Sequence, residues 1–208
     1  MRIGLVGAAF LAPLLLSAPA RADDNCDEIS AIVSQVEQAG FTGAYAEGMS
    51  IDPGHVPEEC RIALADALAA YRARLSGAVA GPEHTRYRHW LFWEEAKWAG
   101  RAQLYDRAAA LTRLANAERH HQPDSYFEAI AAFLARDRAA YDAAYLQLMR
   151  DVQTRYYGHN TEIARSVGDA LIAGGEALGL CWDRPFVEAF SLACSNQVMD
   201  RLIQARQR

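Results

Sequence analysis

The sequence predicts an all-α protein of about six helices, two of them long ones that frame an antiparallel helical bundle. Apolar residues recur at helical spacing through most of the 208 residues. No stretch alternates apolar and polar residues for long enough to indicate a strand. Four cysteines follow an N-terminal segment of the exported type, so we expect the bundle to be crosslinked by disulfide bonds.

Residues 1–22 have the three parts of a secretory signal: Arg2, an apolar run over 3–16, and the small-x-small site Ala20-Arg21-Ala22. The apolar run of about 14 residues is shorter than the roughly 20 that span a bilayer. We therefore expect cleavage after Ala22, a single helical domain over 23–208, and no integral membrane segment in the mature chain. The expected location is periplasmic or secreted.

The charge balance argues against a nucleic-acid partner. The whole chain carries a formal charge of −5, and cleavage after Ala22 removes Arg2 and Arg21 but no acidic residue, which lowers the charge to −7. No basic stripe is present. Lys97 is the single lysine and alanine is abundant, a bias that we interpret as genomic.

The four cysteines are Cys26, Cys60, Cys181 and Cys194, and their even number in an exported chain favours two structural disulfides. A last helix that began near Arg184 would place Cys194 about 15 Å along its axis. That distance exceeds the Cα separation of about 4.4–6.8 Å that a disulfide allows. This favours bridges from the first two helices to the C-terminal hairpin, while sequential pairing stays open if the last helix begins later.

The first two helices are separated by a long loop. The first helix is short and ends at Gly40, a plausible C-terminal stop. Residues 41–56 contain three glycines and Pro53 without apolar periodicity, which predicts a loop. The second helix opens at Pro57, because proline is tolerated in the first helical turn.

The central element is predicted to be a long helix whose first half, 84–98, holds three of the four tryptophans. Its apolar pattern continues past Gly100, which we expect to kink the helix without ending it. Pro123 disfavours helix in the residue before it, so the helix ends by Gln122.

A second long helix is predicted from a capping box, Ser125 with Glu128, to a glycine stop at Gly158. Another helix begins at Asn160 or Thr161 and weakens at Gly174-Gly175. A last helix starts at Asp183, with Pro185 just inside it.

Two adjacent carboxylates, Glu94 and Glu95, are the weak catalytic candidates. A glutamate on the apolar face of a helix has a raised pKa, which suits a general acid, and a lysozyme-like cell-wall hydrolase is therefore an alternative function. The competing interpretation is a carboxylate that is paired with Arg88, Arg101 or another arginine.

Glu118 and His121 are the weak metal candidates, because Glu-x-x-His places a carboxylate and an imidazole on one helical face. Di-iron bundles need this motif from two helices, and here it occurs once. A periplasmic metal- or haem-binding bundle is a further alternative, with Met149, Met199 and His89 as possible haem ligands. Nothing in the spacing selects a ligand pair, so no cofactor is expected.

Trp90, Phe92 and Trp93 are the candidate binding residues. They occupy three of four successive positions, which cover about 300 degrees of a helix. Either helices enclose this one from both sides, or part of the aromatic surface meets a ligand or partner. Our main functional prediction is an exported bacterial cell-envelope protein that acts by protein or ligand binding, as an accessory, adaptor or inhibitor. Its expected partner is a cell-envelope protein.

Overall fold

The structure is a computed structural model that describes residues 26–46, 51, 54, 56–118, 125–158, 161–190, 194, 196, 198, 200, 201 and 204. All regular structure within these residues is helical, which confirms the predicted all-α class. The predicted signal, 1–22, lies outside the described residues. Of the helices that are described, none combines the length and apolar character needed to cross a membrane.

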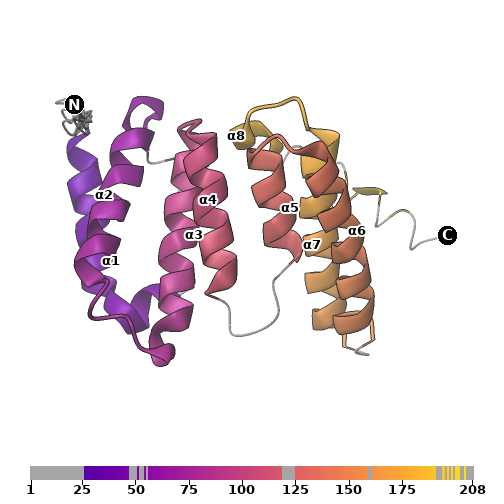
Figure 1. The fold of residues 1–208 in the computed structure, drawn as a ribbon, viewed down its shortest axis with the longest axis horizontal. Helices are drawn as coiled ribbons and strands as arrows, with labels where there is room; N and C mark the ends of the chain where they lie inside the picture. Colours follow the sequence, from indigo (N-terminus) through magenta and orange to yellow (C-terminus); the bar gives the residue numbers. More distant parts are fainter. Residues whose placement is uncertain are drawn as a thin grey trace, which may run out of the picture.

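The main helices stand side by side, and α7 lies between α5 and α6 in this view (Figure 1). α1 and α2 form one end, α3 and α4 the middle, and α5, α6 and α7 the other end, while α8 returns towards α3. Their bounds are α1 Asp27–Ala46, η2 Glu58–Cys60, α2 Arg61–Leu75, η3 Pro82–His84, α3 Thr85–Arg101, α4 Tyr105–Ala117, α5 Ser125–Leu134, α6 Arg138–Arg155, α7 Glu162–Leu180 and α8 Phe186–Ala189.

The first predicted long helix is a helical hairpin, so the prediction of one continuous kinked helix was wrong. α3 ends at Arg101, and the backbone reverses at Gln103, whose φ of 61° is in the left-handed region. Arg88 near the start of α3 contacts Glu118 at the end of α4, as antiparallel packing requires. The apolar period continues across the reversal because each helix buries one face against the other.

The second predicted long helix is also a hairpin. α5 ends at Leu134, Arg136 has a left-handed φ of 55°, and α6 begins at Arg138. Asp137 caps α6 by accepting a hydrogen bond from the backbone N–H of Ala140 at 3.0 Å. The bundle is therefore framed by hairpins of shorter helices.

The glycine predicted to end the first helix, and the glycine pair predicted to weaken a later one, both lie inside helices. α1 continues through Gly40 and Gly43 to Ala46, so the prediction of a short first helix was wrong; each interior glycine costs a helix only about 1 kcal/mol. α7 begins after Thr161, as predicted, and continues through Gly174 and Gly175. A Cβ atom on Gly174 would lie 2.7 Å from the Tyr126 hydroxyl, so this glycine permits close packing on α5.

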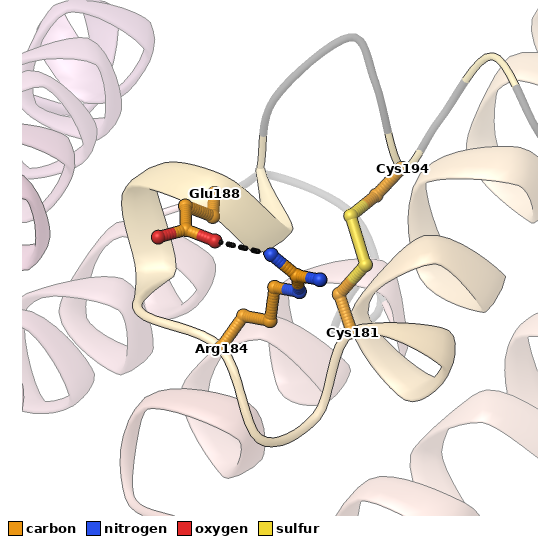
Figure 2. The surroundings of a disulfide bond; sticks show 4 residues. All are labelled: Cys181, Arg184, Glu188 and Cys194. Atoms are coloured by element: carbon orange, nitrogen blue, oxygen red, sulfur yellow. Dashed lines mark hydrogen bonds and ion pairs between the residues drawn. A yellow bond between two sulfur atoms is a disulfide. The ribbon is translucent and has the colours of Figure 1, made fainter.

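The disulfides pair in sequence order, Cys26 with Cys60 and Cys181 with Cys194, with Cα separations of 5.6 and 6.6 Å. Bridges from the first helices to the C-terminal hairpin were therefore the wrong preference. α8 ends at Ala189, so no straight helix separates Cys181 from Cys194. Figure 2 shows this disulfide beside α8.

Candidate functional site

The aromatic candidates on α3 are enclosed from two sides. Trp90 is 7 % exposed and stacks on Tyr87 at 5.8 Å, within a cluster that α1 and α2 complete. Phe92 is half-buried, and the guanidinium of Arg72 from α2 lies 4.7 Å above its ring. On this side α3 faces the N-terminal helices.

Trp93 points to the opposite side of α3. Its ring makes edge contacts with Phe127 of α5 at 4.8 Å and with Phe190, which follows α8, at 6.1 Å. The three aromatic residues point to different sides of α3, and other helices pack against them on both sides. A partner contact through Trp90, Phe92 and Trp93 stays a prediction, with Phe92 and Trp93 as its half-buried part.

Glu94 is buried at 2 % exposure in α3. Its Oε1 accepts a hydrogen bond from Lys97 Nζ at 2.5 Å, and the backbone of Ile51 also stabilises the charged carboxylate. Burial raises the pKa of the Glu94 carboxyl, and the charges of Lys97 and Arg101 oppose this shift. The raised pKa matches expectation, but the enclosed position gives the carboxyl little access to a substrate.

Glu95 is equally buried and joins three helices. Its Oε2 accepts from Arg72 of α2 at 2.8 Å, and its Oε1 accepts from Arg107 of α4 at 3.0 Å. Arg107 also pairs with Asp66 at 2.5 Å. Both oxygens of Glu95 are therefore engaged by guanidinium groups, as the arginine-paired interpretation anticipated.

The metal candidates are only partly described. Glu118 pairs with Arg88 at 2.8 Å, and His121 lies outside the described residues. His89 Nδ1 lies 2.6 Å from the carbonyl oxygen of Ala115. Among the residues that the structure describes, no three histidine, cysteine, aspartate or glutamate side chains gather closely enough to hold a metal ion.

An open groove between α4, α5 and α6 was missed by the sequence reasoning. Its volume is about 630 Å³, within the range of about 300–1,000 Å³ that is common for ligand pockets. One side of α5 lies between walls that α4 and α6 contribute. Most of its lining is alanine, supplied by Ala117, Ala131, Ala132, Ala140, Ala143 and Ala144.

The rest of the groove lining is an aromatic ring and polar side chains. Phe127 is buried at its α5 side, while Arg113 and Glu128 are exposed on α4 and α5. Neither Arg113 nor Glu128 makes an ion pair with any described residue. The groove can therefore hold apolar side chains and offers one charge of each sign.

The abundance of alanine is the sequence signal of this groove, and by itself it is equally explained by genomic composition. Comparison with family models, with curated proteins and with solved structures finds no match to this chain.

Proposed function

We propose that this chain is an exported cell-envelope protein that binds a partner protein through the groove between α4, α5 and α6. The observation that carries the proposal is the 630 Å³ alanine-lined groove. Its walls are helices rather than loops, so the binding surface is largely formed before the partner arrives.

The lining favours a peptide segment as the occupant. Alanine side chains leave room for large apolar side chains of a partner, in the manner of knobs that enter holes. Arg113 and Glu128 lie on different helices and carry opposite charges. A segment with an apolar side chain between an acidic and a basic residue would complement this surface.

Two separate observations support an exported location. The N-terminal segment has the pattern of a cleavable signal, and two disulfides are typical of proteins in oxidising compartments. A periplasmic or secreted location, with an accessory, adaptor or inhibitor role, is consistent with both. The hydrolase alternative stays a prediction, but Glu94 and Glu95 are not part of the groove lining.

Site-specific photo-crosslinking in the exporting cell tests the proposal. A photo-reactive amino acid at Gln147, in the groove wall, should crosslink a defined envelope protein. The same probe at Ala110, an exposed position of α4 outside the groove, is the matched control.

A second variant gives the experiment its specificity. Ala140→Trp fills the groove from an exposed position of α6 and should abolish the Gln147 crosslink. Ala110→Trp should leave the crosslink intact. The proposal fails if Ala110 and Gln147 capture the same protein equally, or if filling the groove changes nothing.

A further inference from the structure

We infer that the exposed face of α6 is a docking surface for a second copy of this chain, paired antiparallel about Leu146. This face of α6 adjoins the groove and shares Ala143 with its lining, but the apolar and charged residues that carry the inference lie outside the groove. It starts from two apolar side chains that the fold leaves uncovered. Leu146 is 60 % exposed and Met149 is 40 % exposed.

These residues lie apart from the buried stripe of α6. The helix buries Tyr141, Leu148 and Val152 against its neighbours. Leu146 and Met149 are three residues apart and are therefore neighbours on the helix surface. Leu146 and Met149 therefore form a small contiguous apolar patch on the surface of α6.

The charges around Leu146 are self-complementary. Asp142 precedes Leu146 by one helical turn and Arg150 follows it by one turn, so both share its face. In an antiparallel pair centred on Leu146, Asp142 meets the partner's Arg150, and Arg150 meets the partner's Asp142. A parallel pair would place each charge against itself, which costs energy, so the charges select the antiparallel arrangement.

In this antiparallel register, side chains of complementary size also face each other. Ala143 precedes Leu146 by three residues and Met149 follows it by three, so the small side chain meets the partner's large one. Leu146 meets its own copy at the axis. The surface therefore complements itself, as the isologous interface of a two-fold dimer requires.

The charged residues are available for these contacts. Asp142 accepts a hydrogen bond from Arg138 at 3.0 Å, but both side chains are more than half exposed, and such pairs contribute little stability. The Arg150 guanidinium makes no ion pair within the part of the chain that is described. An interchain pair therefore replaces no strong existing contact.

Sedimentation equilibrium of the mature protein over a concentration series tests the inference. We expect a reversible dimer, which Leu146→Glu converts to a monomer. Leu180→Glu is the matched control, because Leu180 is also exposed, at 46 %, but lies on α7. The inference is overturned if the unaltered protein is monomeric throughout, or if Leu146→Glu leaves the dimer intact.

Charge exchange tests the register. Asp142→Arg places like charges together at two symmetric contacts and should raise the dimer dissociation constant by at least about tenfold. Asp106→Arg makes the same charge change at an exposed position of α4 and should have little effect.

Restoration is the decisive result. The double variant Asp142→Arg with Arg150→Asp should recover the original dissociation constant, because each pair again joins opposite charges. Unchanged helical circular dichroism would show that every variant is folded. A double variant as weak as Asp142→Arg alone would rule out this pairing.

Discussion

At the scale of single residues, Glu95 connects α3 to two neighbouring helices through charged hydrogen bonds. Its carboxylate is 2 % exposed and joins arginines from α2 and α4. A buried charge is tolerated only when its partners compensate for the lost hydration. The loss of this charge would leave Arg72 and Arg107 facing each other without an anion between them.

We expect Glu95→Gln to lower the free energy of unfolding by about 3 kcal/mol, the scale for removing one member of a buried ion pair. Glu188→Gln is the control. It breaks the Arg184–Glu188 pair of Figure 2, whose side chains are 64 % and 52 % exposed. That change should cost less than about 1 kcal/mol. Urea unfolding measures both, and equal losses would contradict the central role of Glu95.

Tyr141 links α6 to α7 from within the core. Its hydroxyl donates a hydrogen bond to the backbone carbonyl of Gly175 at 2.7 Å. Burial raises the pKa of Tyr141 from 10.0 to about 12, and the neighbouring Tyr145 adds to the shift. The folded state therefore holds this proton more tightly than the unfolded state.

The sign of this shift predicts a loss of stability in alkali. Below pH 10 the phenol is protonated in both states, and between pH 10 and about 12 only the folded state keeps the proton. The stabilisation is present below pH 10 and declines as pH rises towards 12. We expect Tyr141→Phe to lose about 1 kcal/mol at neutral pH. Above pH 10, the free energy of unfolding of Tyr141→Phe should fall less steeply with pH than that of the unaltered protein. Urea unfolding at several pH values measures both. Equal slopes for the two proteins would show that the pKa of Tyr141 is not raised.

At the scale of helices, two residues with left-handed backbone turn the predicted long helices into hairpins. Gln103 and Arg136 adopt positive φ although neither is glycine. Arg136 gains compensation, because its guanidinium donates hydrogen bonds to the carbonyls of Trp182 and Arg184. Gln103 is exposed, and its turn is fixed by backbone hydrogen bonds such as Leu104 N–H to Ala99 carbonyl at 2.9 Å.

The effect of a substitution at Gln103 on stability should depend on how well the new residue tolerates a positive φ. A β-branched residue is strained at positive φ, so Gln103→Val should lower stability by about 1–2 kcal/mol. Gln103→Gly removes the steric cost but adds freedom to the unfolded chain, and should change stability by less than about 1 kcal/mol. Thermal unfolding measures both, and similar effects of the two variants would argue against a tight turn here.

At the scale of the whole molecule, α8 connects the C-terminal part of the described chain to its centre. Phe186 is buried against Gly100 in α3, where an added Cβ atom would lie 2.7 Å from the ring. The Cys181–Cys194 disulfide closes the chain around α8. Glycine at position 100 thus allows α3 and α8 to approach closely.

We expect Gly100→Ala to destabilise the protein by about 1–3 kcal/mol, because the added methyl group overpacks this contact. Gly77→Ala is the control, since nothing lies within 4 Å of a Cβ atom there. Chemical unfolding distinguishes them. Equal stability of the two variants would mean that Phe186 moves aside without cost.

Export of the whole chain gives a prediction that needs no structural variant. Intact-mass measurement of the exported protein should give a chain that begins at Asp23 and contains two disulfides. Addition of a reductant should raise its mass by four hydrogens, since no free cysteine is present among the described residues. Retention of residues 1–22 would contradict cleavage after Ala22.

The local sequence indicated the surroundings of Glu95 but not the groove. The buried, arginine-paired environment of Glu95 was one of two interpretations open from its place on an aromatic helix. The groove was not predicted, because its alanines come from three helices and no local pattern joins Ala117 to Ala131 or Ala144. Which of the many alanines line the groove depends on how the three helices pack together.

Local chemistry alone determined that this chain forms helices, since apolar spacing and helix starts such as Thr161 act within a few residues. The cysteine count likewise indicated two disulfides. Tertiary structure decided where the helices reverse, because Gln103 and Arg136 carry no local signal of positive φ and the apolar period is the same on both sides of each turn. It also decided the cysteine pairing, which depends on where α8 ends in space.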